Sequence, residues 1–105
     1  MYENISRFIA EILISGKVSE GEPEGFLRRT NTAYFVFECD NDIKALTTEI
    51  YQHSVKLHAL DAMLDSLSGD ERNTNVESQM AVKDWFRQTL GSLESRFEKY
   101  LKLSH

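Results

Sequence analysis

The stretch NDIKALTTEIYQHSVKLHALDAMLDSL, residues 41–67, decides the fold because its apolar side chains recur at the spacing of a packed helix. When Ile43 is taken as position a of a heptad, every a and d position is aliphatic except His53. The stretch predicts a long helix over about residues 42–68, which Gly69 and Asp70 end. The a positions are Ile43, Ile50, Leu57 and Leu64, and the d positions are Leu46, His53, Leu60 and Leu67.

A second long helix is predicted to follow the first. Thr74 and Glu77 have the spacing of a capping box, in which a hydroxyl and a carboxylate satisfy the free amides at a helix start. Together with the apolar pattern that follows, they predict a helix over about residues 74–103. Because the connection between the two helices is short, we expect them to fold back as an antiparallel hairpin.

The register of this hairpin is predicted by one offset, which sets Leu57 opposite Phe86 and pairs nearly every apolar position. The same offset places His53 opposite Leu90, beside Gly91. A polar residue at such a position specifies register or oligomeric state at some cost in stability. We expect His53 to set the register, with pH sensing as the alternative because histidine titrates near neutral pH.

The N-terminal segment predicts a short amphipathic helix over about residues 4–15, with its apolar residues in one stripe. Gly16 supplies its end, since glycine readily takes the left-handed conformation found after helices. A helix this short is marginal alone, so it must dock on the rest of the chain. Residues 16–25 are a candidate hinge, with a possible helix start near Pro23.

Residues 32–39, TAYFVFEC, are ambiguous. Their aromatic and β-branched content is typical of a strand, whereas the heptad phase of the long helix runs back through Val36 and Cys39. We expect a helix, because a lone strand leaves its backbone groups unpaired unless a second chain supplies a partner. The strand is the alternative. The predicted fold is all-α: one helical domain over residues 1–105, a bundle built on the long hairpin.

The composition is that of an acidic chain of 105 residues with a formal net charge of −5. Residues 31–70 hold seven Asp or Glu and only two Lys or Arg. We expect no nucleic-acid binding, because phosphate contacts need a basic surface. No apolar run approaches the length of a membrane span, and Glu3 and Glu11 interrupt any signal-peptide core. With a single cysteine, the chain is expected to be cytoplasmic and to bind no membrane.

The sequence contains no recognisable catalytic, cofactor or metal site. Cys39 has no nearby base, and no cluster of His and Cys has the spacing of a zinc site. Asp61 and Asp65 form an i, i+4 pair, but acid–base catalysis needs a carboxyl in a pocket and nothing marks one. We expect a protein that is not an enzyme and that takes no cofactor or metal.

An interaction surface is predicted from the acidic middle segment and the single tryptophan, since charged groups steer a partner of opposite charge. Trp85 lies beside the seam residue Phe86 and, like Met63, Met80 and Val82, reaches off the contact line of the hairpin. This second apolar stripe must be covered by the N-terminal helix, by a second copy in a homodimer, or by a partner. The candidate surface comprises Glu38, Asp40, Asp42, Glu49, Asp61, Asp65 and Trp85.

The function expected from these features is noncatalytic binding of another protein, with a basic protein as the favoured partner. Small acidic helical adaptors, chaperones, immunity proteins and inhibitors share this size and charge. The alternative is a dimeric regulatory or sensory helical protein. It would associate with DNA through a ribbon formed by residues 33–38 of two chains.

Overall fold

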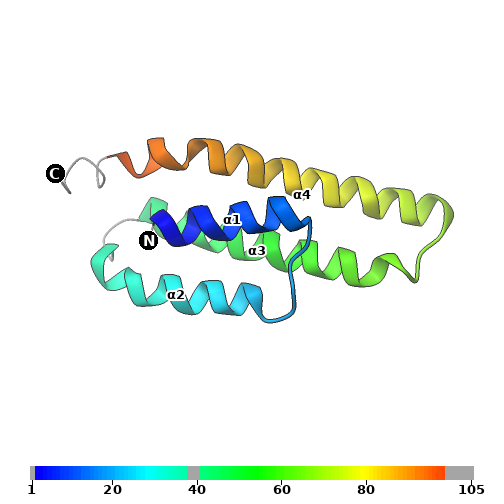
Figure 1. Ribbon diagram of the computed structural model, residues 1–105, viewed down its shortest axis with the longest axis horizontal. Coiled ribbons are helices and arrows are strands. Elements are labelled where there is room, and N and C mark those ends of the chain that lie inside the picture. The colour runs from blue at the N-terminus through cyan, green and yellow to red at the C-terminus, as the bar shows by residue number, and fades with distance from the viewer. Residues whose placement is uncertain (1, 38–40, 99–105) are drawn as a thin grey trace.

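The computed structural model describes residues 2–37 and 41–98, with side chains for residues 2–30 and 41–98. This part of the chain forms four helices and no strand (Figure 1). The predicted all-α helical bundle is confirmed. The helices are α1 (Tyr2–Ser15), α2 (Glu22–Phe37), α3 (Asn41–Leu64) and α4 (Gly69–Arg96).

The four helices form an up-and-down bundle in which each packs against its neighbours in the chain (Figure 1). α1 contacts α2 and α4, and α3 contacts the same two helices from the other side. Consecutive helices run antiparallel because the connections between them are short. The first helix is therefore an integral side of the bundle and closes it against the last.

α1 forms as its pattern predicts. Its buried side chains share one stripe, and the helix ends where Gly16, at φ 73°, donates its amide to the carbonyl of Ile12 at 2.7 Å. Residues other than glycine are strained at this positive φ. The predicted helix start and end, residues 4 and 15, agree closely with the observed bounds. The buried residues are Ile5, Phe8, Ile9 and Ile12.

α2 is a separate helix and not an extension of the long one. Pro23 lies in its first turn, where a missing amide costs nothing, and the acidic Glu22 and Glu24 suit the positive pole of the helix dipole. Residues 32–37 are helical, so the strand alternative is wrong for them. The β-ribbon considered for residues 33–38 is therefore excluded for residues 33–37, which are helical. Glu38 and Cys39 lie outside the described residues.

The hairpin between α3 and α4 is confirmed, but the helix ends at its turn were predicted wrongly. α3 ends at Leu64 and not near residue 68, because the chain tightens into a turn in which Leu67 donates to the carbonyl of Leu64 at 3.2 Å. Ser68, with extended backbone angles, is the N-cap of α4, which places Thr74 inside the helix. α4 ends at Arg96, with Phe97 as its C-cap, so the predicted continuous helix to about residue 103 is wrong at Phe97; residue 103 itself lies outside the described residues.

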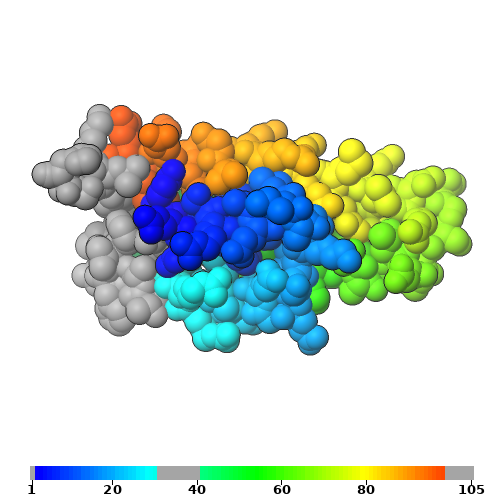
Figure 2. Space-filling view, in the orientation of Figure 1, coloured from blue at the N-terminus to red at the C-terminus, as the bar shows by residue number. Residues whose placement is uncertain are grey.

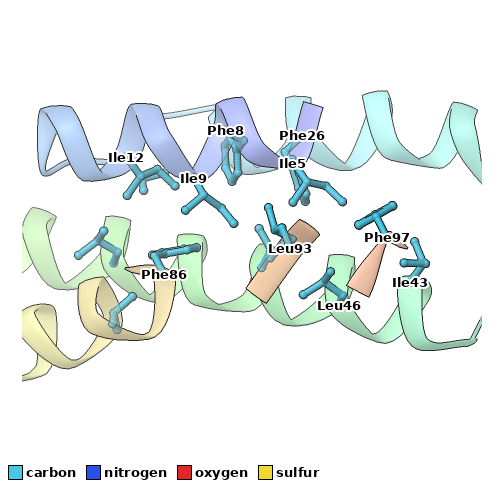
Figure 3. Packing of buried hydrophobic residues seen from close by; sticks show 14 residues of the cluster. Ile5, Phe8, Ile9, Ile12, Phe26, Ile43, Leu46, Phe86, Leu93 and Phe97 are labelled. Carbon is cyan, nitrogen blue, oxygen red and sulfur yellow. The ribbon is translucent and has the colours of Figure 1, made fainter. Parts of the chain in front are cut away.

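One apolar core joins all four helices (Figure 3). The side chains of Ile5 and Ile9 point from α1 toward Leu93 of α4. Phe8 of α1 stacks on Phe26 of α2, with ring centroids 4.4 Å apart and planes 17° from parallel. Such a pair adds roughly 0.5–1.5 kcal/mol to the stabilisation from burial. The core lies mainly along α1 and the helix segments beside it.

The helices differ in length, and this difference shapes the surface. α1 has 14 residues and α4 has 28, about 21 Å and about 42 Å of helix. The hairpin of α3 and α4 consequently projects past α1 and α2, as Figures 1 and 2 show at the green-to-yellow end of the molecule. We call this projecting part, residues 59–80, the hairpin tip.

Candidate functional site

The hairpin tip exposes a side of α4 that α1 covers further along. Positions 76, 83, 90 and 97 are about two helical turns apart and so share one side. Phe97 meets Tyr2 of α1 edge-on at 5.6 Å, and Lys83 reaches the end of α1, its Nζ 3.5 Å from where a Cβ on Gly16 would lie. Val76 is the next position along this line. No part of α1 remains to cover it.

Apolar side chains are exposed at the tip. Met63, Val76 and Met80 are exposed by 53%, 40% and 58%, and they are three of the five large apolar residues that are exposed in the described part of the chain. The other two, Ile14 and Val55, lie on α1 and α3 outside the tip. The tip is therefore the one region where the described surface gathers exposed apolar groups from both helices of the hairpin.

The two helices of the tip are joined by side-chain amides. Asn75 donates to the carbonyl of Leu60 at 2.9 Å, and Gln79 donates to the amide oxygen of Asn75 at 2.8 Å. Both amide side chains are buried. They occupy the positions that face the core in the rest of α4, where apolar side chains would be expected. Arg72 adds a second link between the helices, donating to the carbonyl of Leu64 at 2.9 Å. These bonds fix the tip without an apolar core of its own.

The tip is strongly acidic. Its only Lys or Arg is Arg72, against five carboxylates. This segment therefore carries most of the net charge of −5 of the whole chain. The carboxylates are Asp61, Asp65, Asp70, Glu71 and Glu77.

The predicted acidic surface does not form one face. Asp42 and Glu49 lie together on α3, where with Arg96 of α4 they line a shallow depression of about 370 Å³. Asp61 lies on the same helix but roughly a third of a turn around it, at the tip, and Asp65 lies in the turn that follows the end of α3. Glu38 and Asp40 lie outside the described residues. Whether any of these residues contacts a partner stays a prediction.

Trp85 and His53 form a stacked pair where α3 and α4 meet. Their ring centroids are 3.7 Å apart and their planes 3° from parallel. The imidazole also lies edge-on to Phe86, at 6.2 Å. Leu90, the facing residue predicted for His53, is about one turn away from these rings along α4. A role for His53 in register or pH sensing remains a prediction, but the aromatic partners of the ring were not anticipated.

His58 makes a long-range contact that sequence reasoning missed. Its Nδ1 lies 2.7 Å from the carbonyl oxygen of Val18 in the connection between α1 and α2. Since a carbonyl only accepts, Nδ1 carries the proton. The bond ties the connection to α3, next to a depression of about 450 Å³ bordered by Pro23 and Val55. The hinge predicted for residues 16–25 is not tested, but this bond anchors the segment to α3 at Val18.

The described interior contains polar groups without titratable chemistry. Every buried polar side chain among residues 2–30 and 41–98 is a hydroxyl or an amide. Within these residues no group of three His, Cys, Asp or Glu side chains could hold a metal ion. The buried polar residues are Thr30, Thr47, Ser54, Asn75, Gln79 and Thr89.

None of the helices in the described part of the chain is both long and apolar enough to cross a membrane. In comparisons with known proteins, no family model, no curated protein and no solved structure matches the chain. The fold and the surface of the hairpin tip are therefore the basis for assigning a function.

Proposed function

We propose that the protein is a noncatalytic protein–protein interaction module, and that it binds its partner through the hairpin tip. The observation that carries this proposal is the exposure of Met63, Val76 and Met80 on a part of the bundle that α1 and α2 leave uncovered. Exposed apolar groups that gather on one surface and are rimmed by polar residues are typical of interaction sites.

The placement of polar groups supports binding more than catalysis. An enzyme needs titratable side chains held in a partly desolvated pocket. The polar groups buried in the described part of this chain are hydroxyls and amides, most of which bond within their own helix, while the amide of Asn75 bonds across to α3. The carboxylates of the tip lie on its surface or at its edge, where they act through charge.

Four kinds of protein fit this proposal: a small adaptor, a chaperone, an immunity protein and an inhibitor. All of them act by occupying a surface of another protein, and none requires a cofactor. Their common requirement is a rigid element that presents contact groups, and a two-helix projection braced by side-chain hydrogen bonds meets it.

The proposal is tested by comparing three baits in extracts of the cells that make the protein. The baits are the unaltered chain, Met80→Glu and Ile14→Glu. Met80 and Ile14 are both exposed, by 58% and 87%, so the two variants make the same chemical change on and off the tip. Far-ultraviolet circular dichroism checks that both variants keep their helices.

We expect a discrete set of proteins to be enriched by the unaltered chain and by Ile14→Glu, and to be lost with Met80→Glu. A buried Glu in the complex would leave a desolvated charge without a partner, which costs several kcal/mol. If all three baits enrich the same proteins to the same extent, the tip is not the binding surface and the proposal fails.

A further inference from the structure

We infer that the groove between α1 and α2 is a binding site for a small zwitterion, whose carboxylate is held by Arg29 and whose amino group faces Glu11. α1 and α2 lie side by side in the bundle (Figure 1). Two adjoining depressions, of about 280 and 400 Å³, lie between them and share Phe8, Glu11 and Arg29. We call the two depressions together the α1–α2 groove. It is separate from the hairpin tip, and the inference does not depend on the proposed function.

Gly25 is the first feature that marks the groove. It is buried inside α2 and its φ is not positive, so the backbone does not require a glycine there. Glycine also lowers the stability of a helix relative to alanine. In the described part of the chain, and apart from the neighbours and helix backbone of Gly25, a Cβ there would meet only two guanidinium groups. They are those of Arg29, with Nη1 at 3.3 Å, and Arg28, with Nη2 at 3.8 Å.

Gly25 therefore leaves the space in which two positive charges converge. Like charges held near one point repel each other, and an anion bound beside them removes this cost. Arg7 of α1 lines the smaller depression together with Arg29, so a third guanidinium borders the groove. Within residues 2–30 and 41–98, no hydrogen bond or ion pair holds the side chain of Arg7 or Arg29. Their planar forks of donors match the two oxygens of a carboxylate.

The groove also carries negative charge, and this charge decides which anion fits. Glu11 lines both depressions, and Glu20 and Glu22 border the larger one. These carboxylates would repel a phosphate dianion, whereas they would attract an amino group. A ligand with one carboxylate and one amino group matches both signs. Its class is that of amino acids and short aminoalkyl carboxylates.

Phe8 gives the groove an apolar floor. It lines both depressions, and its ring stacks on Phe26 of α2. Because Phe8 belongs to the core and is only 3% exposed, the floor is in place before a ligand arrives. A short aliphatic chain between the two charged ends of the ligand would lie against it, as apolar surfaces do in small-molecule sites.

The inference is tested by nuclear magnetic resonance on the full chain labelled with ¹⁵N. The probes are γ-aminobutyrate, butyrate and n-butylammonium, which share one carbon chain and differ in their charged groups, together with inorganic phosphate. We expect γ-aminobutyrate to shift the amide signals of Phe8, Glu11, Gly25 and Arg29 along a saturable curve. Each of the other three probes should bind at least about fivefold more weakly, because each lacks one of the two charges or carries the wrong one.

Two matched pairs of variants assign the roles. Arg29→Gln should weaken binding of γ-aminobutyrate at least about tenfold, because it removes the charged fork. Arg87→Gln, at an exposed arginine of α4 outside the groove, should leave binding unchanged. Glu11→Gln should weaken binding of γ-aminobutyrate but not of butyrate. Glu3→Gln, at an exposed position of α1, should change neither.

Gly25→Ala separates the groove from the stability of the fold. Alanine favours a helix, so thermal unfolding should show no loss of stability. The added Cβ would displace the guanidinium of Arg29, so binding of γ-aminobutyrate should weaken several-fold. Gly91→Ala is the control, since a Cβ there would meet nothing within 4 Å, and it should leave binding unchanged. This pair gives a result even if Arg29→Gln disturbs the packing of α2.

Other outcomes overturn the inference. Shifts that grow without saturation, or that spread evenly over the chain, would mean that the groove is not a site. Equal binding of butyrate and γ-aminobutyrate would remove the role of Glu11, and tighter binding of phosphate would exclude selection of a carboxylate. Unchanged binding in Gly25→Ala would show that Gly25 does not shape the groove. The baits of the proposed function report on the hairpin tip alone, so either proposal can fail without the other.

Discussion

The imidazole of His53 lies flat on the indole of Trp85, with ring centroids 3.7 Å apart and planes 3° from parallel. Nδ1 of the same imidazole lies 2.7 Å from the carbonyl oxygen of Glu49 one turn earlier, so Nδ1 is the donor. Phe86 closes the group edge-on to both rings. His53, at a d position of the heptad, therefore makes an aromatic contact between α3 and α4.

The stack predicts a measurable coupling between its two residues. We expect His53→Ala and Trp85→Ala to destabilise the fold by amounts that are not additive, because either change alone removes the contact. The coupling free energy should be about 1 kcal/mol, the typical value for an aromatic pair. Urea unfolding of the two single variants and the double variant measures it, and strict additivity would show that the stack contributes nothing.

The two side-chain hydrogen bonds of Asn75, which we call the amide bridge, predict that this residue contributes strongly to the stability of the hairpin tip. Asn75→Ala removes the bond to the Leu60 carbonyl and leaves the buried amide of Gln79 without its acceptor. We expect a loss of about 1–2 kcal/mol in urea unfolding, together with faster amide exchange in the tip. Asn73→Ala, at an exposed neighbouring position, is the control and should change stability by less than about 0.5 kcal/mol. Equal effects of the two changes would refute the bridge.

Two glycines predict stability changes of opposite sign. Gly16 has φ 73°, so Gly16→Ala forces a side chain into the left-handed region and should cost about 1 kcal/mol. Gly91 lies inside α4, and a Cβ there would meet nothing within 4 Å, so Gly91→Ala should stabilise by roughly 0.5–1 kcal/mol. Thermal unfolding of both variants checks the signs. A fall in Tm for Gly91→Ala would mean that its surroundings are not open.

The bond between His58 and Val18 predicts local control of the connection between α1 and α2. His58→Phe keeps a ring but removes the donor, and should cost about 1 kcal/mol. It should also speed the exchange of the amides of Lys17 and Ser19, which flank the released carbonyl. Gln52→Ala, at an exposed position of the same helix, is the control and should leave that exchange unchanged. Unaltered exchange in His58→Phe would show that the connection is held by packing alone.

The ends of a helix could be predicted from the sequence where only one residue nearby is suited to start or end it. Gly16 follows a clean apolar stripe, and α1 ends there. At the turn of the hairpin, Ser68 and Thr74 are both good N-cap residues, and the sequence alone favoured the wrong one. The helix starts at the earlier serine, which extends α4 by more than a turn and lengthens the tip.

The tip itself could not be read from the sequence, because its exposure depends on where other helices end. Val82 and Met80 both lie outside the heptad line, yet Val82 is buried in the core whereas Met80 is 58% exposed. The pairing of His58 with Val18 joins residues that are 40 positions apart, and no local pattern signals it. Heptad periodicity finds the contact between two helices and leaves the other sides of each helix undetermined.

Photo-crosslinking inside the cells that make the protein tests the central claim most directly. A photoreactive amino acid is placed at position 80 in one variant and at position 14 in another, both of which are exposed in the isolated chain. The account predicts a discrete crosslinked adduct with another protein from position 80 and none from position 14. The absence of an adduct at position 80, or equal adducts at both positions, would contradict the assignment of the hairpin tip as the binding surface.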